Sequence, residues 1–331
     1  MTRREAILEG AQAAIRLHDE LGTRQAVESA IGCIDVFGAL LEHDVALLFR
    51  PLEGLLGFCI KGPETPGVVV STQRPLHIQR FTGAHELGHV ALGHTLSLDG
   101  DEILQRGGSL QDEREIAANS FASAFMLPRW LLQMHARRQG WNRASMDDPH
   151  AVYQLALRLG ASYHATCVAL ERHGIIDAIT REKLIAKPRR DLKLELLRDV
   201  DVENLYADVW LLSERDEGLT LEGQPDDLFV LRLGESGSAG YLWNTTALVE
   251  SGFAVLRDKR EIPAPETGIG GKTTRALTVR RSEPASGTLA LEQKRPWAQS
   301  EPPAASLHLD YDLFGKELGL ARAARRQLMA A

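Results

Sequence analysis

The chain has little of what marks secreted, membrane-spanning or generally nucleic-acid-binding proteins. It contains three cysteines in 331 residues, Cys33, Cys59 and Cys167, and they are widely separated. An odd, scattered set of thiols does not suit a disulfide framework, so we expect reduced cysteines. No apolar run is long enough to cross a bilayer, and the first ten residues lack the apolar core of a secretory signal. These absences predict a cytoplasmic protein that does not enter a membrane.

Basic charge is also in deficit, because the formal net charge is −7. This excess of acid argues against general affinity for nucleic acid, although a local basic face is compatible with it. A hydrophobic content of 44% and a charged content of 25% are ordinary for a globular protein. The length of 331 residues favours two domains.

The stretch His85-Glu86-Leu87-Gly88-His89 reads H-E-x-x-H. On a helix, residues four apart share a face, so both imidazoles can bind one metal ion. Glu86 lies about 100° around the helix, where it can act as a base on a water molecule at that ion. The alternative is a pair of surface histidines on an amphipathic helix. The apolar continuation over residues 90–92 favours a buried helix, in which these polar groups need a strong partner.

A catalytic zinc ion usually takes three protein ligands, so a third must lie elsewhere. The metzincin pattern fails, because its glycine position is Leu92 and its third histidine position is Thr95. His94 follows His89 by five residues, which turns it away from the ligand face.

Residues 113–127 predict a second helix, which ends before Pro128. Glu115 and Asn119 form an E-x-x-x-N pattern on it, with Glu115 as the candidate third ligand. Asn119 can hydrogen-bond a ligand imidazole and fix its orientation. The alternative is an exposed carboxylate in a charged first turn, and Glu113 is the nearest competing ligand.

Three segments, residues 80–89, 115–122 and 126–128, resemble the ImmA/IrrE metallopeptidases, over roughly residues 25–185. The chain departs from that pattern at Ala118, where the family often has a glutamate. The resemblance implies zinc (Zn²⁺) held by His85, His89 and Glu115, with Glu86 as general base. It also implies a cytoplasmic protease that cuts a partner repressor or another regulator.

Peptide hydrolysis also calls for a group that stabilises the oxyanion. The sequence does not choose among the candidates, which are His77, His94, Tyr153, Tyr163 and His164.

The N-terminal part predicts helices over 6–21 and 24–41 and short strands at 46–49, 56–60 and 67–71, forming a small sheet against the motif helix. Helices over 151–159 and 164–173 resemble a helix-turn-helix. They would contact DNA or a partner, or simply form a helical hairpin that covers the core. Residues 187–190 are basic, and residues 186–204 are interpreted as a connector.

After residue 205, short alternating segments separated by turn residues predict a β-sandwich. The candidate strands are 205–210, 220–222, 228–233, 241–244, 276–280, 288–293 and 306–311. Loops at 237–243, 268–271 and 295–297 resemble those of the chagasin family of cysteine protease inhibitors, although the lead into the first loop departs from that family. The resemblance covers roughly residues 205–313. The candidate partner-binding residues are Tyr241, Trp243, Gly270, Gly271, Arg295, Pro296 and Trp297, with Trp243 and Trp297 alternatively in the sandwich core.

The sequence thus predicts a multidomain protein. An α+β zincin-like metallopeptidase core (1–135) precedes a helical, helix-turn-helix-like extension and connector (136–204). An all-β, immunoglobulin-like chagasin-like sandwich (205–313) and a C-terminal helix or tail (314–331) follow. The leading hypothesis is a zinc endopeptidase that cuts a specific protein, with the sandwich as recognition domain. The alternatives are a protease-binding inhibitor and a DNA-associated regulator.

Overall fold

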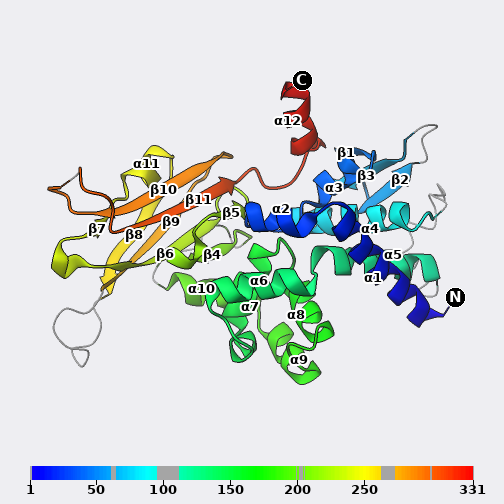
Figure 1. The fold of residues 1–331 in the computed structure, drawn as a ribbon, viewed down its shortest axis with the longest axis horizontal. Helices are drawn as coiled ribbons and strands as arrows, with labels where there is room; N and C mark the ends of the chain where they lie inside the picture. Colours follow the sequence, from blue (N-terminus) through cyan, green and yellow to red (C-terminus); the bar gives the residue numbers. More distant parts are fainter. Residues whose placement is uncertain are drawn as a thin grey trace.

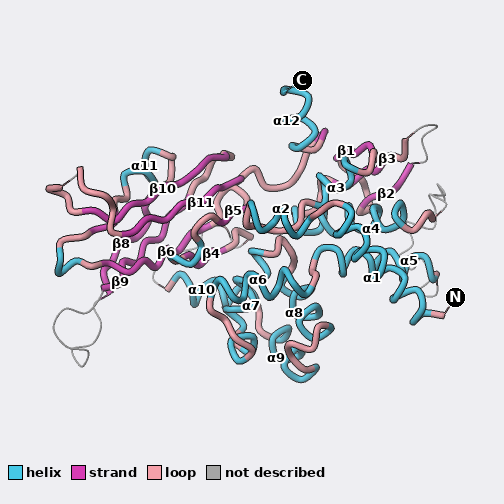
Figure 2. The backbone as a smooth tube through the Cα atoms, viewed as in Figure 1, coloured by secondary structure: helices cyan, strands magenta, loops and turns pink. Residues whose placement is uncertain are grey.

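The structure is a computed structural model that describes residues 2–60, 65–94, 112–198, 200, 204, 206–261, 273–298 and 300–330. Figure 1 shows a mainly helical N-terminal part and a β-rich C-terminal part, as the sequence predicted. Figure 2 shows the same division by secondary structure. Within these ranges, no helix combines the length and hydrophobicity needed to cross a membrane.

Three helices form the framework of the N-terminal part. Helix α1 (Arg3–Glu20) packs along α5 (Glu113–Met126), and α4 (Leu76–Ala91) packs against both. The α1–α5 contact depends on Gly10, because a Cβ there would lie 2.0 Å from the Ala117 carbonyl oxygen. Only glycine lets the two backbones approach so closely.

A small sheet covers one side of α4. Strands β1 (Ala46–Arg50), β2 (Gly57–Ile60) and β3 (Gly67–Ser71) confirm the three predicted strands. The order is β12-β1-β3-β2, with β1 parallel to β3 and β2 antiparallel to β3. Val68 and Val70 share a hydrophobic core with Ala84 and Leu87 of α4, so the sheet packs on the motif helix as expected.

The predicted single helix over 24–41 is wrong. The chain forms α2 (Thr23–Ser29) and α3 (Val36–Glu42) with a break between them. Asp35 starts α3 by accepting a hydrogen bond from Gly38 N at 2.8 Å. In the break, the Ile31 carbonyl accepts from Thr220 N of the C-terminal part at 2.7 Å. This tertiary contact overrides the local helical pattern.

The helical extension contains more helices than the sequence indicated. The predicted pair is present as α7 (Pro149–Arg158) and α8 (Tyr163–Arg172), joined at Gly160 with φ +61°. The region interpreted as a connector contains a helix, α10. The other elements are α6 (Arg129–Gln139), η1 (Ala144–Asp147), α9 (Ala178–Ala186) and α10 (Arg189–Leu197).

Two four-stranded sheets form the C-terminal part, in the orders β5-β11-β10-β7 and β4-β6-β9-β8. Their buried residues, among them Phe229, Leu277 and Leu307, form one shared hydrophobic core. The strands are β4 (Val209–Leu212), β5 (Leu219–Glu222), β6 (Leu228–Glu235), β7 (Leu242–Trp243), β8 (Ala254–Glu261), β9 (Thr273–Arg280), β10 (Ser286–Lys294) and β11 (Ala305–Asp312), with short helices η2 (Glu214–Asp216), η3 (Gly237–Ala239) and α11 (Thr246–Glu250).

Strand β8 was missed by the sequence reasoning. Its residues are mostly exposed and charged, which is typical of a loop pattern. It is an edge strand, and charged side chains on an edge discourage pairing with other chains.

The chain returns to the N-terminal sheet at its C-terminal end. Strand β12 (Gly319–Leu320) pairs antiparallel with β1, and α12 (Arg322–Ala330) follows. The expected helix over 314–331 therefore forms only in its second half. Just before β12, Glu317 N donates to Gln79 Oε1 at 2.8 Å, and Gln79 Nε2 donates to the Glu317 carbonyl at 3.1 Å. The C-terminal segment is thereby fastened to α4.

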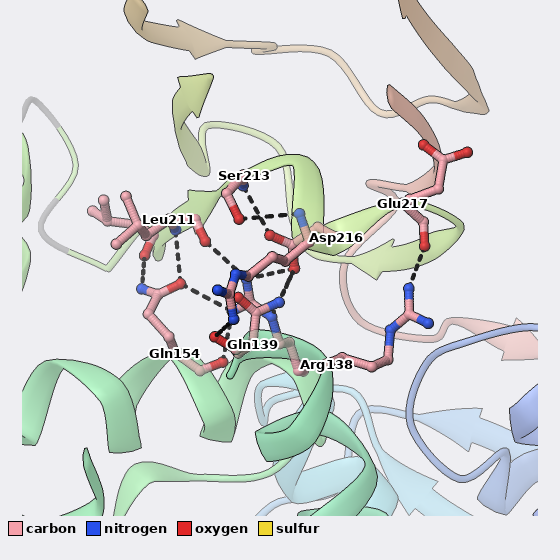
Figure 3. A network of polar contacts seen from close by, with 10 residues as sticks. Arg138, Gln139, Gln154, Leu211, Ser213, Asp216 and Glu217 are labelled. Carbon is pink, nitrogen blue, oxygen red and sulfur yellow. Dashed lines mark hydrogen bonds and ion pairs between the residues drawn. The ribbon is translucent and has the colours of Figure 1, made fainter. Parts of the chain in front are cut away.

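A buried ion pair joins the helical extension to the β-rich part (Figure 3). Arg158 of α7 bonds Asp216 of η2 through Nε at 3.0 Å and Nη2 at 2.7 Å, and both side chains are 1% exposed. Gln139 of α6 donates to the same carboxylate at 2.7 Å. Gln154 joins the network by accepting from Leu211 N. The two parts of the chain therefore meet through a fully bonded polar network.

We expect Asp216→Asn to destabilise the chain by about 3 kcal/mol, because it leaves the Arg158 guanidinium buried without a counter-charge. The free energy of unfolding in urea measures this loss. The matched control is Glu28→Gln, which removes the exposed Arg24–Glu28 pair and should cost less than about 1 kcal/mol. Equal losses from the two substitutions would contradict the assigned role of the junction.

Candidate metal centre

Helices α4 and α5, which carry the candidate ligands, pack closely at Gly88. A Cβ at Gly88 of α4 would lie 3.0 Å from the Phe121 ring of α5, so a larger residue would require that buried ring to shift. Asp112 begins α5 by accepting from Arg114 N at 2.9 Å, which places Glu115 in the first turn. The first turn of α5 therefore lies beside the second half of α4.

Three candidate ligands converge between these helices. His85 Nε2 lies 3.3 Å from Glu115 Oε2, and His89 Nε2 lies 3.2 Å from Glu115 Oε1. The two Nε2 atoms are 3.1 Å apart. Among the described residues, these three are the group of histidine, cysteine and acidic side chains placed to share a metal ion. Glu113, the competing ligand candidate, is not part of the group.

The remaining ring nitrogens of both histidines are held by neighbours. Asn119 Oδ1 lies 3.2 Å from His85 Nδ1. Because that amide oxygen only accepts, Nδ1 carries a proton, so Nε2 is the nitrogen left to bind an ion at the shared centre. His89 Nδ1 lies 2.9 Å from His94 Nδ1. Such partners fix the ring orientation of metal-binding histidines.

The donor set fits a zinc ion. Around a tetrahedral ion with typical zinc–ligand bonds, neighbouring ligand atoms lie roughly 3.3 Å apart. The three separations of 3.1, 3.2 and 3.3 Å match this spacing. Two imidazole nitrogens and one carboxylate directed at one point require a cation or a shared proton between them. His85, His89 and Glu115 are therefore the residues that would hold the ion.

The candidate ligands shift one another's pKa values. The two imidazoles bond the Glu115 carboxylate and hold its pKa well below the usual value. Burial lowers the pKa of His85, but the hydrogen bond to Glu115 and the charges of Glu86 and Glu115 outweigh it, so its pKa is raised. Glu115 is therefore ionised and ready to act as a ligand.

Glu86 is buried beside these ligands, at 8% exposure. Burial raises the pKa of Glu86, and the charges of His85 and His89 oppose that rise. The Cys59 thiol of β2 shares a hydrogen bond with the Glu86 carboxylate, and burial raises the pKa of that thiol above its usual range. A carboxylate with a raised pKa can hold a proton closer to neutral pH.

The five candidates for stabilising the oxyanion lie in different surroundings in the structure. Tyr153 donates to Asp208 of the β-rich part at 2.9 Å, and Tyr163 donates to the Leu184 carbonyl of the helical extension at 3.0 Å, so both hydroxyls have structural partners. His77 is half-buried on α4, where burial lowers its pKa and the charge of Asp208 opposes that change, while His164 is exposed on α8. Of the five, His94 is the one in contact with a candidate ligand. The spacing of five residues keeps His94 off the ligand face, but it brings His94 Nδ1 within 2.9 Å of His89 Nδ1.

The predicted partner-binding residues of the β-rich part differ in their exposure to solvent. Trp297 is 74% exposed, and its ring lies against Gly240, where a Cβ would be 2.5 Å away. The Arg295 guanidinium carbon lies 4.5 Å from the centre of the Tyr241 ring. Pro296 lies between Arg295 and Trp297. Gly270 and Gly271 lie outside the described residues.

Trp243 is a core residue and not an exposed anchor. It is 2% exposed, and its Nε1 donates to the Gly234 carbonyl at 2.9 Å. The alternation of strand β7 turns it inward, between the two sheets.

Two family models match separate parts of the chain. Residues 42–171 match the IrrE N-terminal-like domain (Peptidase_M78), and residues 224–311 match the chagasin family of peptidase inhibitors (I42). The chain therefore carries an IrrE-like domain followed by a chagasin-like domain. This confirms both resemblances seen in the sequence.

Similar proteins match mainly the chagasin-like domain. Amoebiasin-2 from Entamoeba histolytica is 27% identical over 103 residues, which cover 31% of this chain and 83% of that protein. The solved cysteine protease inhibitor EhICP2 from the same organism is 24% identical, with a TM-score of 0.29, covering 33% of this chain and 97% of its own.

A Mycobacterium tuberculosis transcriptional regulator is 13% identical, with a TM-score of 0.30, covering 85% of this chain and 82% of its own.

We expect Glu115→Gln to lower the zinc content of the purified protein from near one ion per chain by at least about tenfold at a fixed free zinc level, because the amide loses the ligand charge. His85→Ala should behave alike. Metal analysis after dialysis measures this. Glu113→Gln is the matched control in the same helical turn and should retain its zinc. Zinc loss in Glu113→Gln with retention in Glu115→Gln would contradict the site.

Proposed function

We propose that the chain is a zinc-dependent endopeptidase that cleaves a specific protein partner, a transcriptional repressor or another regulator. The observation that carries this proposal is the convergence of His85, His89 and Glu115, with Asn119 holding the far side of one imidazole. The match of residues 42–171 to an IrrE-like peptidase domain supports it. The zincin-like character of the core and a cytoplasmic location belong to this proposal.

Each side chain has a distinct part in the proposed reaction. Zinc, when bound, supplies Lewis-acid polarisation of the peptide carbonyl and of water. Glu86 takes the proton of the attacking water on its carboxylate and later delivers it to the leaving amine. Its buried surroundings raise its pKa, which suits a group that must both accept and release a proton. Asn119 and His94 keep the two imidazoles oriented.

The proposed recognition module is the chagasin-like domain, with an immunoglobulin-like sandwich. Trp297 is exposed, and Tyr241 and Arg295 are half-buried in the same loops. These residues support a protein-binding role, because tryptophan, tyrosine and arginine are frequent anchors of interfaces. Figure 1 shows β7 at the end of the β-rich part farthest from α4. A partner held by these loops would therefore reach the metal centre only through an extended segment.

The division of the chain at residues 135, 204 and 313 stays a prediction. Nearby, α6 begins at Arg129, β4 begins at Val209 and β12 begins at Gly319. Because β12 pairs with β1, we propose that residues after 313 fold with the N-terminal domain.

A role in DNA binding has less support. The exposed positions of α8 are His164, Val168 and Arg172, and the Arg172 guanidinium donates to the Ser123 carbonyl at 2.9 Å. This arrangement favours a helical hairpin that packs against α5 over a helix that reads DNA.

We expect Glu86→Gln to keep its zinc and to lose cleavage by about 10²–10⁴-fold, because it removes the proton acceptor and leaves the ligands. N-terminal proteomics of a cell extract incubated with either form measures new cleavage sites. Cleavage by Glu86→Gln at the wild-type rate and zinc content would refute the endopeptidase proposal.

The second candidate function is inhibition of a papain-type cysteine protease, favoured by the match of residues 224–311 to an inhibitor family. If it holds, the full chain inhibits papain and Trp297→Ala weakens inhibition by about 30-fold, the loss typical of an interface anchor. Tyr206→Ala, at an 88% exposed aromatic residue away from the loops, is the matched control. Papain that stays fully active with excess protein would remove this candidate and leave the recognition role.

A further inference from the structure

A cavity of about 290 Å³ opens in the helical extension, apart from the metal centre. It lies between α6, the segment that follows it, and the turn after α8. Its apolar wall includes Leu132, Met146, Leu155 and Leu170, all of them buried. Such a wall suits the apolar body of a ligand, because burial of apolar surface favours binding.

Cationic groups surround this apolar wall. Arg129, Arg137 and Arg143 line the cavity, and no aspartate or glutamate does. In the part of the chain that the structure describes, none of these guanidinium groups has a carboxylate within 4.0 Å. Arg143 acts on the charge of Asp177, but that carboxylate caps α9 by accepting from Thr180 N at 2.8 Å. On a chain of net charge −7, three such arginines around one cavity form a local anion-attracting field.

Trp141 gives the cavity an aromatic side. Its ring has the Arg158 guanidinium carbon 5.8 Å from its centre, and it also lines the cavity. Gln133 adds an amide group that can both donate and accept hydrogen bonds. Asn142, whose Oδ1 already accepts from Ser145 N at 3.0 Å, adds amide donors. Together, these lining groups are complementary to one class of ligand. They are the apolar wall, the Trp141 ring and the arginines, which have no carboxylate partner among the described residues.

We propose that this cavity binds a small amphiphilic anion, with an aromatic or branched apolar body and a carboxylate or phosphate head. The body lies on the apolar wall beside Trp141, and the head meets the arginines, whose planar guanidinium groups pair with such oxyanions. The volume of about 290 Å³ is just below the usual range of ligand pockets, which run from about 300 to 1,000 Å³, so it suits a small molecule better than a protein segment.

The position of the cavity links it to the domain junction. Helix α6 supplies Arg129 and Arg137 to the cavity, and the same helix supplies Gln139 to the Asp216 network. Arg138 donates to the Glu217 carbonyl of the β-rich part (Figure 3). A bound anion would therefore contact the helix that holds the two parts together.

Isothermal titration of the full-length chain with three probes tests the proposal. The probes are 2-naphthoate, which has both body and charged head, naphthalene-2-methanol, which has the body alone, and inorganic phosphate, which has the head alone. We expect 2-naphthoate to bind once per chain with a Kd of about 0.1–1 mM, a normal affinity for its size. Each of the other two should bind at least about tenfold more weakly.

Substitutions of the lining residues test whether 2-naphthoate binds in this cavity. The double substitution Arg137→Gln/Arg143→Gln should weaken 2-naphthoate at least about tenfold, and Ala136→Trp should block the cavity from its wall. Arg190→Gln, which removes an exposed arginine of α10 outside the cavity, is the matched control and should leave the Kd within about twofold. Thermal unfolding verifies that each variant folds, and the double variant decides if Ala136→Trp does not.

Three outcomes would overturn the proposal. One is no heat of binding with 2-naphthoate at about 5 mM. Another is equal affinity for the acid and the alcohol, which would leave the arginines without a role. The last is an unchanged Kd in the double variant, which would place the ligand elsewhere. None of these outcomes bears on the zinc site, because the probes and variants leave its residues unaltered.

Discussion

The close approach of α4 and α5 at Gly88 is the constraint on which the candidate centre depends. It sets the first turn of α5 beside the imidazoles of α4, so that Glu115 completes a three-ligand set. Gly10 allows the same closeness on the other side of α5, where α1 packs. Two glycines thus position a carboxylate from a helix that lies over twenty residues further along the chain.

The motif helix is also held from the C-terminal part of the chain. Gln79, nearly three turns before His89, is hydrogen-bonded to the backbone of Glu317, and Arg80 forms an ion pair with Glu222 of β5. Together with the Arg158–Asp216 junction, these contacts join the N-terminal helices to the C-terminal part of the chain.

The sequence predicted what local patterns determine. The spacing of His85, His89 and Glu115, the strands at 46–49 and 67–71, and both family resemblances were readable because each rests on residue types at short range. The elements that the sequence analysis missed depend on long-range contacts or on an exposed edge, which local patterns do not reveal. The break after Ser29 depends on Ile31 meeting Thr220, β12 forms by pairing with β1, and β8 looks like a charged loop because its exposed edge needs no apolar face.

The central claim is that two histidine nitrogens and one glutamate oxygen bind a single zinc ion. X-ray absorption at the zinc edge of the loaded full-length chain tests it most directly. The account predicts nitrogen and oxygen neighbours at about 2.0–2.2 Å, including imidazole scattering from two rings. A sulfur neighbour at about 2.3 Å, as cysteine ligation would give, would contradict it.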